Sequence, residues 1–285
     1  NWVVSWETNR GCPYACTFCD WGSATNTRMR KFSEKKLMDE IEWFGKNKIS
    51  YIDCCDANFG IFIERDSSIA KKLSEVSCEN GFPKTFRPNW AKFSSEKIIP
   101  IAKELQKNGL LRAITLSVQS LDETTLKIIK RENIKFKKFS ELSSSFYENG
   151  IPTYSEIILG LPGETLESFK NGLQIIASDT KIDTIQIYHC GVLPNAPMND
   201  ASYLKEFNIK KIKSPLSSTH SKIEKNNIPE FEEIIVSTLS FDINELKEMY
   251  LYSWIIQTFH SLGILEQICN FYQKQNNFSI LDFYD

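Results

Sequence analysis

Three cysteines near the start of the chain have the residue type and the spacing of a metal site. Cys12, Cys16 and Cys19 lie in the stretch GCPYACTFCDWG, with the pattern C-x3-C-x2-C. Thiolates bind iron–sulfur clusters and zinc. Three protein thiolates would leave one iron of a cubane 4Fe-4S cluster with an open position, as in a catalytic metal site. We therefore predict that Cys12, Cys16 and Cys19 are metal ligands, and we favour an open cluster.

Structural zinc and free thiols are the two alternatives to a cluster at these cysteines. Structural zinc takes four closed ligands, commonly from two C-x2-C pairs, and the sequence has no second pair. Cys54 or Cys55 could still supply a fourth thiol. Unligated thiols in a loop would oxidise, which disfavours the second alternative. Eight cysteines in 285 residues are too few for a disulfide scaffold.

The elements that must position the cysteines alternate between strands and helices. Apolar and β-branched stretches predict six strands, within residues 3–7, 49–60, 84–93, 111–120, 152–164 and 181–190. Periodic apolar residues and capping residues predict helices at 33–46, 66–79, 94–107, from 122, 136–148 and 165–178. This alternation requires parallel strands with right-handed crossovers. Both a doubly wound sheet and an incomplete barrel satisfy it.

The polar loop motifs all follow predicted strands. They are the cysteine loop, DANFG, SVQS, GLPGE and YHCGVLPNAP. Sites in folds of this kind collect at the carboxyl ends of the strands. We therefore expect one site on one rim.

The pattern changes towards the carboxyl terminus. Residues 195–231 are polar and irregular, and EIIVSTLS at 233–240 is typical of one more strand. Residues 241–275 form a long amphipathic helical pattern that we expect to break near Gly263. We therefore divide the chain into residues 1–194, which hold the alternating units, and a mostly helical extension at 195–285.

The composition narrows the classes of function. Hydrophobic residues make up 41% and charged residues 25%, and the formal net charge is -2, so no electrostatic argument for nucleic acid follows. No apolar run reaches the roughly 18 residues of a membrane span, and the first residues do not form a signal peptide. We expect a cytoplasmic protein with neither a nucleic-acid nor a membrane partner.

Several motifs together resemble the radical S-adenosylmethionine (radical SAM) superfamily. The cysteine loop matches its C-x3-C-x-F-C signature, with Phe18 in the aromatic position. EIILGLPGET at 156–165 resembles the fifth-strand motif that holds adenine, and SVQS followed by LKIIKREN resembles the fourth-strand segment. The resemblance implies an α/β fold, a partial (β/α)6 barrel of radical SAM type. It also implies a 4Fe-4S cluster, S-adenosylmethionine, and an electron donor such as flavodoxin or ferredoxin.

The resemblance also implies a reaction. The open iron of the cluster binds the amino and carboxylate groups of S-adenosylmethionine, and one electron then splits a C–S bond. The usual product is a 5'-deoxyadenosyl radical, which abstracts hydrogen from a small-molecule or peptide substrate. The cofactors supply this chemistry, and the protein positions them.

A narrower resemblance is to the cobalamin-dependent radical SAM enzymes. It rests on CDWG, DANFG, SVQSLDETTLKIIKREN and the helical tail. These enzymes usually carry an N-terminal cobalamin-binding domain, which is absent from this chain, as is its D-x-H-x-x-G motif. The resemblance implies cobalamin-dependent methyl transfer or a related functionalisation of C–H bonds, with cobalamin held by a domain outside this chain. The alternatives are a cobalamin-independent dehydrogenase, epimerase or sulfur-inserting enzyme, and a zinc-stabilised binding module.

The candidate cofactor-binding residues stand at the ends of the predicted strands. Ser117 and Gln119 alternate with apolar residues, so both point to one face, and Glu156 is an acid in an apolar strand that needs a partner. Glycine at 160 would let the backbone approach the adenine. The full set is Phe18, Asp56, Asn58, Arg87, Ser117, Gln119, Glu156, Gly160 and Leu161.

Several of these residues could equally have a plain structural role. Asp56 and Asn58 are common in ordinary turns, and Arg87 could form a salt bridge instead of binding a carboxylate of cofactor or substrate. Trp21 could face the substrate or shape the loop, and of these roles we expect packing. Tyr188 and His189, which end the sixth predicted strand, are the candidates for proton handling, although the histidine could equally be structural.

Overall fold

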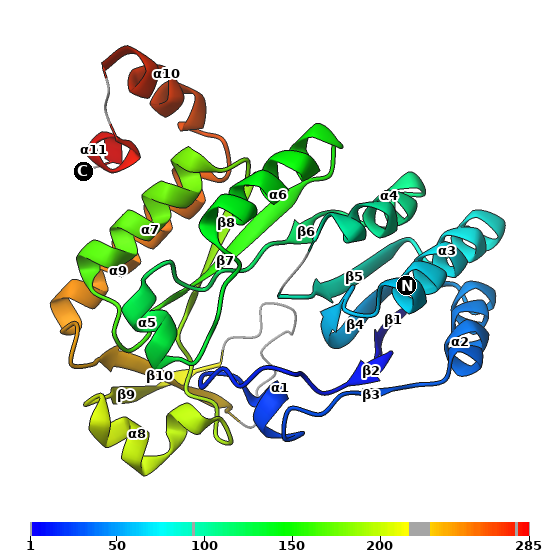
Figure 1. The fold of residues 1–285 in the computed structure, drawn as a ribbon, viewed down its shortest axis with the longest axis horizontal. Coiled ribbons are helices and arrows are strands. Elements are labelled where there is room, and N and C mark those ends of the chain that lie inside the picture. The colour runs from blue at the N-terminus through cyan, green and yellow to red at the C-terminus, as the bar shows by residue number, and fades with distance from the viewer. Residues whose placement is uncertain (1, 93–94, 217–228, 277–278, 285) are drawn as a thin grey trace.

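Two parallel three-stranded sheets form the centre of the computed structural model, which describes residues 2–92, 95–216, 229–276 and 279–284 (Figure 1). The first sheet has the order β1 (Trp2–Trp6), β4 (Ile49–Phe59) and β5 (Thr85–Trp90). The second has the order β6 (Ile114–Thr115), β7 (Thr153–Leu159) and β8 (Thr184–His189). Strands β5 and β6 are in contact, and the N–H of Phe86 donates to the carbonyl of Leu110 at 2.8 Å. The six strands therefore follow one another in chain order.

Helices connect the strands and cover the sheets. Figure 1 shows α2 (Glu34–Lys46), α3 (Ile63–Asn80) and α4 (Ile99–Lys107) beside the first sheet, with the 3-10 turn η1 (Glu96–Ile98) before α4. α5 (Glu123–Ile128), α6 (Phe136–Glu148) and α7 (Leu166–Asp179) accompany the second sheet.

Capping side chains begin three of these helices, and two of the caps, Ser33 and Asp122, were predicted. Ser33, Asp122 and Thr165 accept hydrogen bonds from the first turns of α2, α5 and α7, and Thr165 forms a capping box with Ser168. The predicted cap at Ser94 lies outside the described residues.

The fourth strand is much shorter than predicted. β6 has only two residues, whereas the sequence pattern predicted a strand within 111–120. The backbone turns into the left-handed region at Gln119, with φ of +65°, and Gln119 forms only an isolated bridge with Ile157. The N–H of Gln119 still donates to the carbonyl of Glu156 at 2.8 Å, and the carbonyl of Gln119 accepts from the N–H of Ile158 at 2.9 Å, so the segment stays beside β7. The left-handed residue interrupts a regular ladder there.

The C-terminal part adds an antiparallel hairpin and further helices. After η2 (Pro197–Asn199) and α8 (Ala201–Glu206), β9 (Lys210–Pro215) pairs with β10 (Phe231–Ser237). The N–H of Val192 donates to the carbonyl of Glu233 at 2.7 Å, which fastens the hairpin to the exit of β8. The sequence indicated β10 but not β9.

The last helices end the described chain. α9 (Ile243–Ile255) continues as a π-helical turn at Ile256–His260, and α10 (Glu266–Asn276) and α11 (Ile280–Tyr284) follow. The interruption therefore falls at the expected position, near Gly263. Helix α9 packs against α7.

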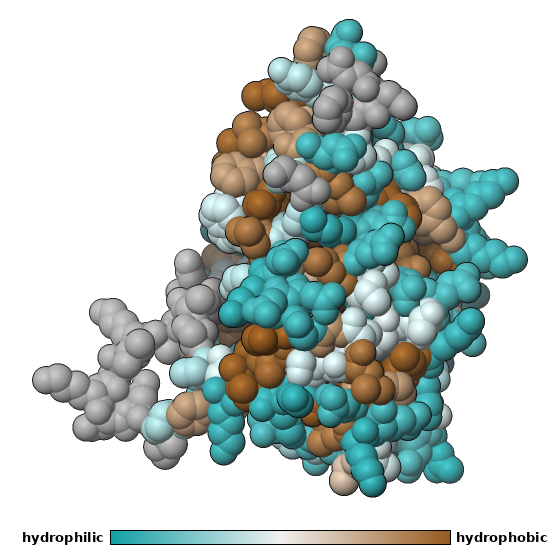
Figure 2. Space-filling view, turned by 90° about the vertical axis from the view of Figure 1, so that its left-hand side faces the viewer, coloured by the Kyte–Doolittle hydropathy of each residue, from teal (hydrophilic) through white to brown (hydrophobic). Residues whose placement is uncertain are grey.

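Hydrophobic side chains form one core under these elements and also remain on the C-terminal surface. Figure 2 shows the side of the molecule that carries α9, with hydrophobic groups standing among hydrophilic ones. The large exposed hydrophobic residues from α9 to α10 are Ile243, Tyr250, Leu251, Trp254, Leu262, Ile264, Ile268, Phe271 and Tyr272. Among the helices of the described ranges, none has the length and apolar character to span a membrane.

Candidate active site

The cysteine loop starts from a buried carboxylate. The N–H of Thr8 donates to Asp56 Oδ1 at 2.7 Å, the N–H of Asn9 donates to the same oxygen at 3.1 Å, and Asn9 Nδ2 donates to Oδ2 at 2.6 Å. The hydroxyl of Thr8 also donates to Oδ2. Asp56 is fully buried. It ties the end of β1 to β4 and sets the direction in which the loop departs.

Two further buried charged side chains, Arg65 and Asp66, hold the backbone at Thr8. Arg65 Nη1 donates to the carbonyl of Thr8 at 3.1 Å, and Arg65 Nε donates to Asp66 Oδ1 at 2.8 Å. Asp66 Oδ2 in turn accepts from the N–H of Gly60 at 2.7 Å. Burial raises the pKa of Asp56, and the hydrogen bonds from Thr8 and Asn9 and the charge of Arg65 oppose that shift. Both backbone groups of Thr8 are thus fixed by buried side chains.

Two glycines allow the loop to fold back on itself. Gly11 has φ of +99°, and a Cβ there would lie 2.0 Å from the carbonyl oxygen of Arg28. A Cβ on Gly22 would lie 1.8 Å from the carbonyl oxygen of Tyr14. Neither position accepts a side chain without movement of the backbone. The short helix α1 (Asp20–Ser23) and the β2–β3 pair, Asn9–Arg10 with Arg30–Lys31, close around these contacts.

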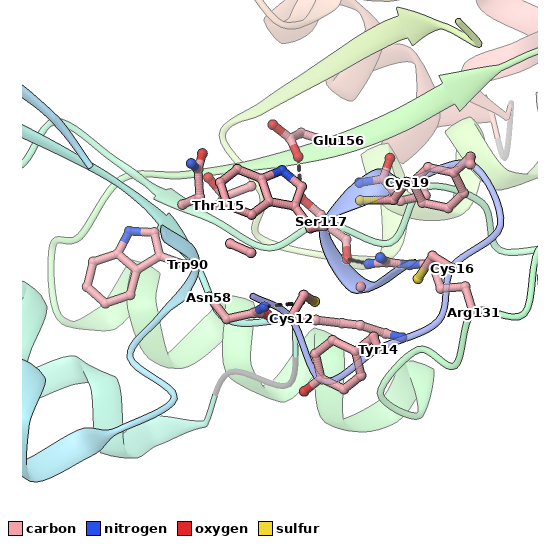
Figure 3. A pocket seen from close by; sticks show the side chains of 17 residues that line it. Cys12, Tyr14, Cys16, Cys19, Asn58, Trp90, Thr115, Ser117, Arg131 and Glu156 are labelled. Carbon is pink, nitrogen blue, oxygen red and sulfur yellow. Dashed lines mark hydrogen bonds between the residues drawn. The ribbon is translucent and has the colours of Figure 1, made fainter. Parts of the chain in front are cut away.

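The closed loop brings the three thiols to one cavity of about 280 Å³ (Figure 3). The carboxyl ends of the strands form its other wall, as the sequence predicted. Eight of the residues singled out from the sequence line this cavity: Cys12, Cys16, Phe18, Cys19, Asn58, Ser117, Gln119 and Glu156. Residues more than a hundred positions apart in the chain thus meet around one space.

Hydrogen bonds order the walls of the cavity. Asn58 Nδ2 donates to Cys12 Sγ at 3.1 Å. Ser117 Oγ donates to Glu156 Oε2 at 2.5 Å, so the acid predicted to need a partner has one across the neighbouring strand. Figure 3 shows Asn58 beside Cys12 and Ser117 beside Glu156.

Arg131 is the main site residue that the sequence reasoning missed. It is 8% exposed, and its Nη2 donates to the carbonyl of Ser117 at 2.6 Å. Figure 3 shows the guanidinium next to Cys16. Burial lowers the pKa of Arg131, and Cys16 opposes that shift. The residue lies in the LKIIKREN stretch, where neither periodicity nor strand ends point to a site.

Other aromatic and polar residues complete the lining. Trp21, which was expected to pack, is 40% exposed and faces the cavity, so that expectation was wrong. The remaining unpredicted residues of the wall include Tyr14, Asn89, Trp90, Lys92 and Thr115. The ammonium of Lys92 lies 4.4 Å from the centre of the Tyr14 ring.

Four predicted cofactor-binding residues do not line this cavity. Asp56 accepts hydrogen bonds from the backbone at the start of the cysteine loop. Arg87 Nη1 lies 3.8 Å from Asp53 Oδ1, which is the salt bridge named as the alternative role of Arg87. Gly160 and Leu161 are buried. The missing side chain of Gly160 would point at Leu246 and Phe241 of the C-terminal part, the nearer of them 3.5 Å away. In this structure Asp56, Gly160 and Leu161 shape the site from outside it.

The candidate catalytic pair lies in a neighbouring cavity. Tyr188 and His189 line a cavity of about 260 Å³, and Phe18, Gln119 and Glu156 separate it from the first because they line both. His189 Nε2 lies 3.0 Å from the carbonyl oxygen of Ile235, and the hydroxyl of Tyr188 donates to Gln186 at 2.5 Å. The structure therefore brings Tyr188 and His189 to the edge of the thiol site.

The donor set of the main cavity fits an iron–sulfur cluster. Among the described residues, no three His, Cys, Asp or Glu side chains converge as the ligands of one ion would, and the three thiols instead surround a space. Asn58 donates a hydrogen bond to Cys12, and the guanidinium of Arg131 lies next to Cys16. A hydrogen-bond donor and a positive charge both favour thiolates. Hydrogen bonds to sulfur also set the potential of iron–sulfur clusters.

The comparisons with known proteins decide the family. The family model of the Radical SAM superfamily matches residues 6–176. The chain belongs to the radical SAM superfamily. The 4Fe-4S cluster and S-adenosylmethionine expected from the cysteine motif are the cofactors of this family, and membership rules out the zinc-stabilised binding module.

Two relatives match nearly the whole chain. It is 34% identical over 284 residues to the cobalamin-dependent radical SAM methyltransferase TokK of Streptomyces tokunonensis, covering 98% of this chain and 41% of that protein. It is also 34% identical to 2-(S-pantetheinyl)-carbapenam-3-carboxylate methyltransferase of Streptantibioticus cattleyicolor, covering 95% of this chain and 40% of that protein. The expected likeness to cobalamin-dependent enzymes is confirmed. The chain spans about two fifths of the length of these relatives.

A solved structure supports the fold. The radical S-adenosylmethionine methyltransferase TsrM of Kitasatospora setae matches 77% of this chain and 42% of its own, with a TM-score of 0.56 and 19% sequence identity. At that identity the match describes the fold alone, an α/β fold of radical SAM type.

Proposed function

We propose that this chain is the S-adenosylmethionine-cleaving part of a cobalamin-dependent methyltransferase, or of a related biosynthetic enzyme, that acts on a small molecule. The observation that carries the proposal is the pair of relatives named as methyltransferases, each 34% identical over almost the full chain. Because the relatives are longer, we place the cobalamin-binding domain ahead of this chain in the whole protein.

The fold proposed for this part is an open (β/α)6 barrel at residues 1–194, with 195–285 as its extension. Six parallel strands in chain order support it. The break between β5 and β6 divides the wall into two sheets whose carboxyl ends face one cavity.

In this proposal Cys12, Cys16 and Cys19 hold the cluster, which when bound supplies the electron that cleaves S-adenosylmethionine. Asn58 orients Cys12 through a hydrogen bond to its sulfur, and Arg131 places a positive charge next to Cys16. Burial raises the pKa of Cys19, which has no such donor side chain in the described structure. The protein therefore places a hydrogen-bond donor or a guanidinium directly beside two of the three thiols, Cys12 and Cys16.

The charges of the cavity suit S-adenosylmethionine, which carries an ammonium, a sulfonium and a carboxylate. Glu156 offers a carboxylate on β7, and Arg131 offers a guanidinium beside Cys16. We assign Glu156, Ser117 and Gln119 to the cationic and hydroxyl groups of the cofactor, and Arg131 to its carboxylate. Phe18 closes the boundary towards the second cavity.

We assign the second cavity to the substrate, with Tyr188 and His189 as the groups that accept or deliver protons there. Burial raises the pKa of Tyr188, with the charge of Glu156 adding to that shift. Tyr188 therefore stays protonated around neutral pH and can donate a hydrogen bond. The electron donor is expected to be a cytoplasmic carrier such as flavodoxin or ferredoxin.

Oxygen-free purification of the whole protein tests this function. We expect about four iron and four sulfide per chain, bound cobalamin, and transfer of the labelled methyl group of S-adenosylmethionine to an acceptor. Cys16→Ala removes a ligand and abolishes both cluster and cleavage, whereas Cys78→Ala, at an exposed position, leaves them intact. Cleavage of S-adenosylmethionine by the whole protein without bound cobalamin would favour the cobalamin-independent alternative.

A further inference from the structure

Three arginines line a further cavity, which shares no residue with the cofactor and substrate cavities. Arg10, Arg28 and Arg30 line about 320 Å³ together with Ala24, Thr25 and Asn26, so no acidic residue stands in its wall. All three arginines are exposed. Arg10 and Arg30 face one another across the β2–β3 pair. The result is a compact positive surface, which we call the arginine surface.

Within the described ranges, acidic side chains neutralise little of the positive charge of the arginine surface. Arg10 Nη2 lies 2.6 Å from Glu7 Oε2, but within the described ranges neither Arg28 nor Arg30 makes an ion pair. Like charges directly opposite each other on paired strands are destabilising. An anionic partner would relieve this repulsion, and complementary charge is what guides and orients protein encounters.

The arginine surface is rigidly joined to a cluster ligand. Arg10 is two residues from Cys12, and Gly11 between them packs on the carbonyl of Arg28. Asn26 and Thr27 hold the left-handed conformation, with φ of 50° and 57°, although neither is glycine. Hydrogen bonds from the N–H of Thr27 to Gly22 and from the N–H of Arg28 to Thr25 stabilise this turn. Anything bound to the arginines therefore lies close to Cys12.

We propose that the arginine surface is the docking site for an acidic electron-transfer protein that reduces the cluster. The inference rests on the proposed function, because a cluster that cleaves S-adenosylmethionine must receive an electron. In the step at this surface the donor is oxidised by one electron and the cluster is reduced by one, and no bond forms or breaks. None of the six residues that line the cavity of the arginine surface also lines the cofactor or the substrate cavity, so a donor bound there leaves those two cavities open.

The interface is expected to be small and sensitive to salt. Electron-transfer encounters use interfaces at the low end of the size range, which three arginines on a hairpin can serve. Electrostatic attraction of this kind raises association rates by roughly 10 to 1,000-fold and weakens as ionic strength rises.

The test compares two reductants with the whole, cluster-loaded protein. We measure cleavage of S-adenosylmethionine driven by an acidic flavodoxin and, separately, by dithionite, which is a small reductant. The variant is Arg28→Glu/Arg30→Glu. The matched control is Lys103→Glu/Lys107→Glu, which makes the same change of charge at exposed positions of α4. Iron content and circular dichroism check that each variant is folded and loaded.

We expect the arginine variant to lose about tenfold or more of the flavodoxin-driven rate at low salt. Its dithionite-driven rate should stay at that of the wild type, and the lysine control should keep both rates. An unchanged flavodoxin-driven rate would overturn the docking site. An equal fall with dithionite would also overturn it, because the arginines would then act on the cluster or the fold.

Direct binding separates this inference from the proposed function. Anisotropy of a labelled flavodoxin needs no turnover, so weaker binding by the arginine variant supports the docking site even if the wild type cleaves no S-adenosylmethionine. Absence of cleavage with dithionite would count against the proposed function alone. If hydrogen exchange of the whole protein showed residues 24–30 covered by another part of its own chain, the docking site would be wrong.

Discussion

Replacing Asp56 by asparagine would test whether a buried carboxylate sets the course of the cysteine loop. The asparagine side chain would have nearly the same shape, but its amide nitrogen cannot accept the hydrogen bonds that Asp56 Oδ2 receives from the side chains of Thr8 and Asn9. Being neutral, it would also leave the buried guanidinium of Arg65, 3.8 Å away, with less opposite charge.

The size of the effect follows from these contacts. Hydrogen bonds to a charged acceptor each contribute about 1.5–3 kcal/mol, and breaking a buried ion pair by removing one partner costs about 3–5 kcal/mol. The terms overlap because they concern one carboxylate, and Arg65 keeps its pair with Asp66. We therefore expect Asp56→Asn to lower the free energy of unfolding by about 3–4 kcal/mol.

Urea unfolding of the oxygen-free protein would measure this change, and iron content would report on the loop. Asp53→Asn is the matched control, because Asp53 stands on the same strand with a side chain 42% exposed and a 3.8 Å ion pair to Arg87. An exposed pair contributes about 1 kcal/mol or less. If both variants unfolded at the same urea concentration as the wild type, the carboxylate would not hold the loop.

Three further substitutions test the closed cysteine loop, the buried carboxyl group of Glu164 and the potential of the cluster. Gly22→Ala should abolish cluster loading, since its Cβ would lie 1.8 Å from a backbone oxygen, while Gly172→Ala, with no atom nearer than 3.8 Å, should load normally; equal iron contents would contradict the closed loop. Burial raises the pKa of Glu164 to about 7, so the folded protein holds a proton that the unfolded chain loses near pH 4.5. Stability should therefore fall by about 3 kcal/mol between pH 4.5 and 7 and level off above, and Glu164→Gln should remove this dependence in urea titrations. Arg131→Leu removes a positive charge beside Cys16 and should lower the midpoint potential of the cluster in a redox titration followed by electron paramagnetic resonance; an unchanged potential would show that Arg131 does not act on it.

Local sequence patterns were sufficient for much of the fold. Ser33, Asp122 and Thr165 cap helices because their side chains bond within the next turn, which needs no distant partner. The rule that sites collect at the carboxyl ends of strands placed Asn58, Ser117, Gln119 and Glu156 around one cavity without knowledge of their distances. The limits of the same reasoning appear in the predicted fourth strand, where regular pairing ends at Thr115 and a left-handed residue at Gln119 interrupts a ladder that periodicity would have continued.

The sequence by itself was sufficient to predict Cys12, Cys16 and Cys19 as the cluster ligands and to indicate the family, because the three cysteines lie within eight residues and their spacing does not depend on the fold of the rest. Only the tertiary structure decided that Arg131 reaches Cys16 and that Asp56 supports the loop. Each of these contacts joins segments more than 40 residues apart. The energy of these contacts depends on distance and burial, which are set only when the two sheets and the loop pack together. No local pattern of residues therefore predicts them.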